Sequence, residues 1–301
     1  MSERLTIGVR GPFSLRAAAE FGFGPNEGSL PPFDGAMRLA FPIDGGRGYA
    51  GVVVRQPHAD GALECELHGG GEPEPTERQV KRVLSLDHDG EAVLEVGRRD
   101  PVIGELQRRH PGQRPVLFYS PYEAAAWSVI SARRPAAQAA RVRRALSARL
   151  GERFELAGET LDAFPAPERL LEATPDDGLH TEKVERLHAV ARAALDGMLD
   201  PGRLAELGPA AAWEAVQGLR GIGPFYASLI VLRATGFADA ELPFAEPRVL
   251  SHVARFYGLP KPPPLNEFHA IAERWRPFRT WVTVLVRLAG DREFGRARAG
   301  R

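Results

Sequence analysis

Apolar positions recur with a period of two in the first third of the chain, which indicates β-structure in that region. Residues 63–68 show the clearest alternation of apolar and polar side chains. Strands are predicted over residues 5–9, 36–41, 49–56 and 63–68. A glycine run follows the last of them as a turn, and residues 76–84 are predicted to form a short helix. We therefore expect a small, sheet-rich α+β domain over residues 1–112.

Beyond residue 121 the period changes to that of helices. Apolar side chains at Val184, Leu187, Ala191 and Ala194 follow the three-and-four spacing of one helix face. Further helices are predicted over residues 136–150, 210–216, 225–234, 248–257, 267–275 and 278–288. The second domain, residues 113–301, is therefore predicted to be all-helical, and the fold class of the chain is α+β.

Two glycines flank a single apolar residue between two of these helices. Gly221 and Gly223 permit a tight hairpin whose backbone can approach a ligand closely. Pro224 suits the first position of the next helix, where a missing N–H costs nothing. The N–H groups of such a hairpin and helix start form an anion site. The segment predicts a helix-hairpin-helix element that binds a DNA phosphate, with an ordinary connection between helices as the alternative.

A carboxylate stands at the start of the following helix. Pro247 again suits a first helical position, which places Glu246 at the cap. The positive end of the helix dipole favours the ionised form of a carboxylate at that position. Glu246 is therefore a candidate for chemistry on a nucleotide sugar, and the alternative is that it only caps its helix.

Composition narrows these possibilities. The chain has 301 residues, of which 44% are apolar and 26% charged, and no apolar run is long enough to cross a membrane. Cys65 is the only cysteine, which excludes a disulfide framework and a cysteine-ligated iron–sulfur cluster. We expect a cytoplasmic protein without a secretory signal. The formal net charge is zero, but basic residues concentrate in residues 133–153 and 261–301, which favours a phosphate-facing surface.

The order of these motifs resembles that of the helix-hairpin-helix DNA glycosylase superfamily. Besides the hairpin and the acid, residues 120–125 (Ser-Pro-Tyr-Glu-Ala-Ala) are similar to the family's entry into its helical domain, and residues 272–279 match a later segment. The resemblance covers most of the chain and is strongest to bacterial 3-methyladenine DNA glycosylase II, the AlkA type. It implies an N-terminal domain like the TATA-binding protein, followed by a glycosylase domain.

The resemblance also implies an activity and its residues. The family hydrolyses the N-glycosidic bond of a damaged base flipped out of double-stranded DNA, as a step of base excision repair. Glu246 takes the place of the family's catalytic aspartate. The expected partners are damaged DNA and no membrane, with a monomeric, nucleoid-associated protein and no cofactor beyond a possible monovalent cation. The DNA contacts are expected at Leu219, Gly221, Ile222, Gly223, Phe225, Arg133 and Arg134; the base pocket at Phe225, Tyr226, Leu229, Arg287 and Tyr122; and the cation at the carbonyl groups of Gln217, Leu219 and Ile222.

Three departures from the family pattern affect the expected chemistry. Phe225 stands where bifunctional relatives carry a lysine, so Schiff-base and strand-cleaving chemistry is not expected. Arg133 and Arg134 occupy the position of the apolar wedge, and Arg287 stands at a pocket position that is usually aromatic. These arginines predict a preference for neutral over cationic bases. The altered acid, wedge and pocket leave an alternative open, namely a paralogue that binds DNA without excising a base.

Overall fold

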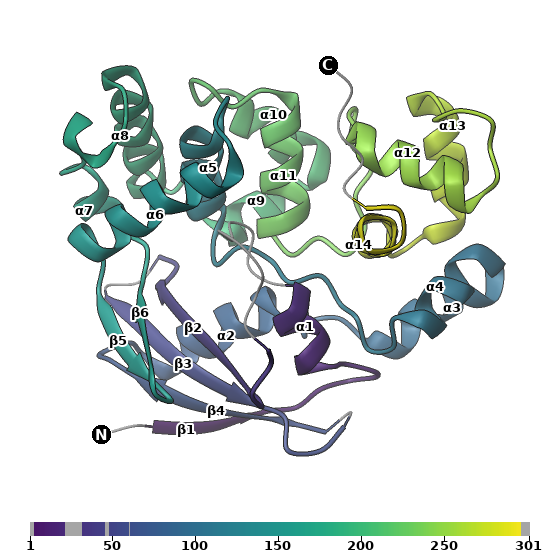
Figure 1. Cartoon of the computed structure of the whole chain (residues 1–301), viewed down its shortest axis with the longest axis horizontal. Helices are drawn as coiled ribbons and strands as arrows, with labels where there is room; N and C mark the ends of the chain where they lie inside the picture. The colour runs from purple at the N-terminus through teal and green to yellow at the C-terminus, as the bar shows by residue number, and fades with distance from the viewer. Residues whose placement is uncertain (1–2, 22–31, 46–47, 60, 296–301) are drawn as a thin grey trace.

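A computed structural model describes residues 3–21, 32–45, 48–59 and 61–295, and its elements are labelled in Figure 1. The first part of the chain forms one antiparallel four-stranded sheet in the order β1-β4-β3-β2. Its strands are β1 (Glu3–Ile7), β2 (Ala36–Pro42), β3 (Tyr49–Arg55) and β4 (Leu63–His68). The predicted sheet-rich unit is therefore present, with β4 at the predicted residues.

One face of this sheet packs against two helices. Helices α1 (Leu15–Phe21) and α2 (Pro73–Val83) share a buried core with the sheet, to which Leu39, Val52 and Leu63 contribute. Glu74 and Arg78 of α2 are exposed on its other side, as expected for an amphipathic helix on a sheet. The cysteine of β4, Cys65, is part of this core.

The other face is covered by a hairpin from the second half of the chain. Strands β5 (Arg153–Leu156) and β6 (Glu159–Asp162) pair with each other and pack against β2 and β3. Phe154 lies so close to Gly51 that a side chain there would collide with its ring. The prediction of an all-helical second domain is therefore wrong at this point. The hairpin forms because the sheet has a second apolar face that must be buried, and a strand from a distant segment supplies that cover.

Two helices that precede residue 112 also pack with the far end of the chain. Helices α3 (Gly90–Arg99) and α4 (Pro101–Arg109) bury Val96 and Ile103 in the same core as Trp275 of the C-terminal region. Their apolar positions have the helical period, but no break in the sequence separates these two helices from the sheet-rich unit.

The remaining helices form two groups above the sheet (Figure 1). One group shares a single core with the glycine turn of residues 221–223, since Leu219 and Ile222 beside the glycines are buried in it. It consists of α5 (Pro121–Ser131), α6 (Ala136–Leu150), α7 (Pro167–Leu170), η1 (Pro175–Asp177), α8 (Thr181–Leu195), α9 (Pro201–Leu207), α10 (Pro209–Gln217) and α11 (Pro224–Ala234). The other group packs with α3 and α4. It consists of α12 (Pro247–Phe256), α13 (Leu265–Ala272), η2 (Glu273–Trp275) and α14 (Arg279–Phe294).

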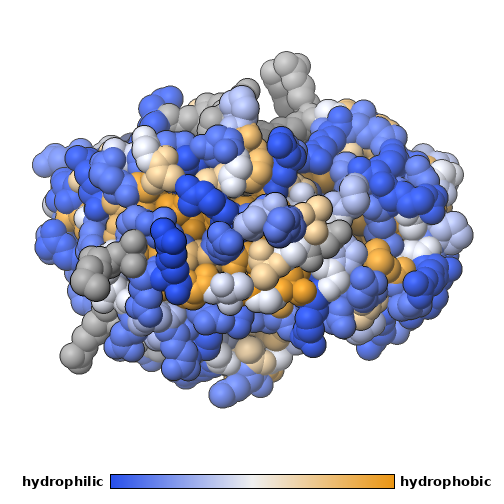
Figure 2. Space-filling view, turned by 90° about the horizontal axis from the view of Figure 1, so that it is seen from below, coloured by the Kyte–Doolittle hydropathy of each residue, from blue (hydrophilic) through white to orange (hydrophobic). Residues whose placement is uncertain are grey.

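The surface agrees with the composition. Seen from below, the molecule is largely hydrophilic, with small hydrophobic areas toward the centre of that face (Figure 2). Within the described part of the chain, no helix combines the length and the apolar character needed to span a membrane. The basic C-terminal run continues past Gly295 into residues 296–301, which lie outside the described residues.

Candidate active site

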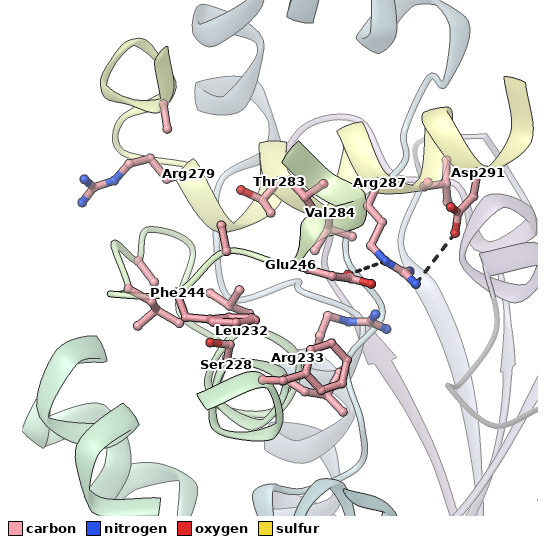
Figure 3. Close-up of a pocket in the computed structure, with 18 of the residues that line it drawn as sticks. Ser228, Leu232, Arg233, Phe244, Glu246, Arg279, Thr283, Val284, Arg287 and Asp291 are labelled. Carbon is pink, nitrogen blue, oxygen red and sulfur yellow. Dashed lines mark hydrogen bonds and ion pairs between the residues drawn. The ribbon is translucent and has the colours of Figure 1, made fainter. Parts of the chain in front are cut away.

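A cleft of about 840 Å³ lies between the two helical groups. Residues of α11, of the loop before α12, and of α14 form most of its wall, and Glu20 and Phe21 at the end of α1 reach it from the sheet side. Apolar side chains alternate with arginine and carboxylate groups in the lining (Figure 3). A concave site with a few convergent charged groups is the usual form of a ligand or substrate site.

The glycine hairpin between α10 and α11 stands beside this cleft, and its two glycines are exposed. Leu219 and Ile222 are buried in the core of their helical group, and the Ile222 N–H donates to the Leu219 carbonyl at 3.0 Å. Gly221 has φ +95°, a conformation that other residues rarely adopt, whereas Gly223 is extended and caps α11 with open space around it. The two apolar anchors fix the turn, Gly223 faces open space, and the Arg186 side chain lies beside Gly221.

Glu246 is the cap residue of α12, but its side chain makes no hydrogen bond to that helix. The loop that carries it is tied down on both sides. Arg279 donates to Asp239 at 2.8 and 2.9 Å, and the Leu242 carbonyl lies 3.1 Å from His269 Nε2. The carboxylate of Glu246 is thereby held in the wall of the cleft, with 24% of the side chain exposed.

Charged groups surround this carboxylate. Arg287 Nε donates to Glu246 Oε2 at 2.8 Å, and Arg248 Nε lies 3.8 Å from Oε1 (Figure 3). Asp291, one turn further along α14, lies 3.8 Å from Arg287 and 3.4 Å from Arg248. Two carboxylates and two guanidinium groups therefore form one continuous network along the cleft.

Arg233 is a third cation next to this network. Its Nη2 donates to the Val116 carbonyl at 2.6 Å, its guanidinium carbon lies 4.7 Å from the ring centre of Phe21, and its Nε has no hydrogen-bond partner. Burial, and to a smaller extent repulsion by Arg287, lowers the pKa of Arg233 to about 10, while attraction by Glu246 opposes the shift. Arg233 stays positively charged at neutral pH and contributes to the field around Glu246.

Of the predicted site residues, the structure brings four into the cleft wall, namely three of the expected base pocket and the catalytic candidate. Phe225, Leu229, Glu246 and Arg287 all line it, and Phe225 is unusually exposed for a large apolar residue, at 43%. Tyr226 packs against the core of its helical group instead and is absent from the lining. The four lining residues come from three separate helices or their caps, so tertiary packing brings them together.

The assignment of Tyr122 to the base pocket is not supported by its position. Tyr122 is buried, and its hydroxyl donates to the Pro165 carbonyl at 2.9 Å, outside the cleft lining. Burial, reinforced by the nearby Glu123 carboxylate, raises its pKa well above the ordinary value. The reason is the orientation of α5: Trp127, five residues later and on a different face, is the residue of that helix that reaches the cleft.

The two predicted wedge arginines also lie outside the lining. Arg133 is exposed with φ +55° in the turn after α5, and Arg134 Nη2 donates to the Gly178 carbonyl at 3.1 Å. Lys183 closes the same turn, because its Nζ donates to the carbonyl groups of Ile130 and Ala132. Burial lowers the pKa of Lys183 to about 8, with repulsion by Arg134 and Arg186 as a smaller cause.

Sequence reasoning missed several charged members of the cleft, and two of them stand next to the Glu246 network. Arg233 follows Phe225 and Leu229 at steps of four along α11, so the helical spacing itself could have identified it. Asp291 follows Arg287 at the same step on α14, but the helix was predicted to end at residue 288 and continues to Phe294. Both are missing from the prediction because charge alone does not distinguish a cleft residue from a solvated one.

Comparison with known proteins was made with the sequence and with the fold. No family model matches the chain. A DNA-3-methyladenine glycosylase of Bacillus subtilis (strain 168) is 23% identical over 213 residues, which cover 69% of this chain and 70% of the relative. A probable bifunctional transcriptional activator/DNA repair enzyme AlkA of Mycobacterium tuberculosis (strain H37Rv) is 26% identical over 292 residues, 93% of this chain. The chain spans 55% of the length of that relative.

The fold comparison is more extensive. The structure of a 3-methyladenine DNA-glycosylase from Archaeoglobus fulgidus matches with a TM-score of 0.77 at 22% identity, over 96% of this chain and 99% of that one. The fold is therefore that of the helix-hairpin-helix DNA glycosylases, and the predicted resemblance to that superfamily is confirmed. Its relatives carry the names of the 3-methyladenine, AlkA type, as the sequence predicts.

Proposed function

We propose that this protein is a monofunctional DNA N-glycosylase of base excision repair that removes an alkylated or otherwise modified base. The observation that carries the proposal is the position of Glu246. Its carboxylate lies in the wall of the cleft and makes no capping hydrogen bond to its own helix, and Phe225, which follows the hairpin glycines, lines the same cleft. The relatives, one named as a DNA-3-methyladenine glycosylase and one as a probable DNA repair enzyme AlkA, support the same class of reaction.

The chemistry follows from that placement. A base that leaves the duplex and enters the cleft brings its deoxyribose close to Glu246. As the bond to the base breaks, positive charge develops on the sugar, and a fixed carboxylate stabilises that charge and orients the attacking water. No amine stands at Phe225 to attack the sugar, so the expected products are a free base and an intact strand with an abasic site.

The hairpin supplies the grip on the DNA backbone. The N–H groups around Gly221 and Gly223 are positioned to bind a phosphate without reading the sequence, and Phe225, at the start of α11, offers an exposed ring for stacking on a base. A monovalent cation fits the inner side of the turn through carbonyl oxygens. Leu219 would be one donor, since its carbonyl accepts only the Ile222 N–H among the bonds described and keeps a lone pair.

The sheet domain and the place of action belong to the same proposal. By its resemblance the sheet domain is assigned a TATA-binding-protein-like fold, and nucleoid DNA in the cytoplasm is the proposed substrate. Arg287 modifies the expected base preference. Because it is paired with Glu246 and lies near Asp291, its charge is largely compensated, and it repels a cationic base less than an unpaired arginine would.

The test is base release from duplex DNA treated with a methylating agent, with the same DNA untreated as the control. The proposal predicts released alkylated bases and abasic sites that are cut only after alkali treatment. The second candidate, a DNA-binding paralogue without turnover, is favoured by one observation, the ion pair that occupies Glu246. Tight binding of the alkylated duplex without any base release would decide for that candidate.

A further inference from the structure

Arg287 lies between two carboxylates of the cleft and is bound closely to only one of them (Figure 3). Its Nε is 2.8 Å from Glu246 Oε2, which is a hydrogen-bonded ion pair. Its Nη2 is 3.8 Å from Asp291 Oδ2, which is an ion pair without a hydrogen bond. A small shift of the guanidinium along α14 would exchange the two partners.

Asp291 is held in place from its other side. His252 Nε2 lies 3.1 Å from Asp291 Oδ1, and Arg248 Nη1 lies 3.4 Å from Oδ2. Because the acceptor is a carboxylate, Nε2 carries the proton. His252 is completely buried, and its ring packs so tightly against Gly290 that a side chain there would collide with it. Arg287, with 32% of its side chain exposed, is the most exposed member of this network, ahead of Arg248 at 28%.

The reaction under the proposed function requires such a movement. While Arg287 is bound to Glu246 Oε2, it neutralises the carboxylate and places a positive charge where the sugar becomes positive. The guanidinium of Arg287 and a positive sugar beside the same carboxylate would repel each other strongly in a partly buried site. Arg233 on α11 and Arg248 on α12 also face Glu246, but neither forms a short bond with it. Arg287 is the cation that blocks the carboxylate.

We propose that Asp291 is a positioning residue that takes over Arg287 when the flipped nucleotide enters the cleft, an inference that rests on the proposed function. The hydrogen bond from Arg287 Nε to Glu246 Oε2 breaks, and one from Arg287 Nη2 to Asp291 Oδ2 forms. The guanidinium needs to move by only about 1 Å to reach the usual length of a charged hydrogen bond. Glu246 Oε2 then faces the sugar, and one hydrogen bond of Arg287 to a carboxylate has replaced another.

The test measures binding and needs no turnover. Two duplexes are compared, one with a pyrrolidine ring in place of a deoxyribose, which is a cation at neutral pH, and one with a neutral tetrahydrofuran ring. The wild type is expected to bind the cationic duplex more tightly. Asp291→Asn should reduce this preference about tenfold, because Arg287 then stays on Glu246, while the affinity for the neutral duplex changes less than about twofold. Asp291→Glu should restore part of the preference.

The decisive comparison repeats Asp291→Asn in an Arg287→Met background. There the substitution should change the preference less than about twofold, because no guanidinium remains to be moved. An equal loss in both backgrounds would overturn the proposal, since Asp291 would then act only through Arg248 and His252. Glu293→Gln, on the same helix, is the control, because that side chain pairs with Arg109 outside the cleft.

The proposal also has a defined result if the Asp291 variant does not fold and if the wild type shows no preference. If Asp291→Asn does not fold, as judged by thermal melting, Arg287→Met alone is measured: it should keep or increase the preference for the cationic duplex, and a loss contradicts the proposal. A wild type without any preference contradicts it as well. If the proposed function fails but this inference holds, base release is absent while the Arg287-dependent preference persists.

Discussion

The hairpin offers a substitution that separates DNA binding from folding. Gly223 is exposed and extended, and a β-carbon added there meets no other atom within 4 Å. Gly223→Val should therefore leave the fold intact, at a cost of about 0.5–1 kcal/mol for a poorer helix cap. The new side chain, however, covers the N–H groups that are proposed to bind a phosphate. Loss of one or two charge-assisted hydrogen bonds costs about 1.5–3 kcal/mol each, which weakens binding roughly tenfold to a hundredfold or more.

The matched substitution at Gly221 should behave differently. Gly221 has φ +95°, and a β-carbon would lie 3.1 Å from the Arg186 side chain, so Gly221→Ala should cost about 1–3 kcal/mol of stability as well as affinity. Gly70→Ala, at another exposed glycine with open space, is the control for both.

Fluorescence anisotropy with two unrelated duplexes at several salt concentrations measures the effect. Affinity should fall equally on both sequences, and the salt dependence should change little, because the lost contacts are backbone N–H groups rather than lysine or arginine. A folded Gly223→Val protein that binds DNA as tightly as the wild type would show that the hairpin is only a turn between helices.

Two smaller predictions concern buried side chains. Burial raises the pKa of the Cys65 thiol to about 12, so the folded protein should resist a thiol reagent that labels it fully in denaturant. The folded state also keeps a proton that the unfolded chain releases above its ordinary pKa near 9. This group should therefore make the stability of the protein fall as the pH rises from 9 to 12. Labelling of native Cys65 at the denatured rate would contradict this. Tyr122→Phe should lower the melting temperature through loss of about 1 kcal/mol from the hydroxyl bond to Pro165, without changing base release, since Tyr122 lies outside the cleft; a loss of activity in a stable variant would place it in the site after all.

Local patterns predicted most of the secondary structure. Residues 63–68 and 136–150 form a strand and a helix with the predicted bounds, because alternation and helical spacing there are not interrupted. The hairpin of β5 and β6 was not predicted, since its four-residue strands are stabilised by the sheet face that they cover, 100 residues away in the chain. The packing of α3 and α4 against α14 is likewise a long-range contact that no local pattern contains.

The site was predictable where a residue's role depends on its own segment. The hairpin glycines and Glu246 were found because a turn and a helix cap have local signatures. The pairing of Glu246 with Arg287 joins two segments of the chain through the packing of α12 on α14, and only the structure shows it. Tyr122 was misplaced for the same reason: the packing of α5 decides which of its faces reaches the cleft, and the aromatic residue on that face is Trp127.

The central claim is that the Glu246 carboxylate performs the chemistry, and its single-turnover rate of base release tests this most directly. Glu246→Gln keeps the size of the side chain and an acceptor for Arg287 but removes the charge, so the rate on alkylated duplex should fall at least tenfold and by about 10²–10³-fold if the charge stabilises the transition state. Affinity for the same duplex should stay nearly unchanged, and Glu267→Gln, an exposed carboxylate on α13 outside the cleft, should match the wild type. A loss smaller than tenfold in Glu246→Gln would show that another group carries the reaction.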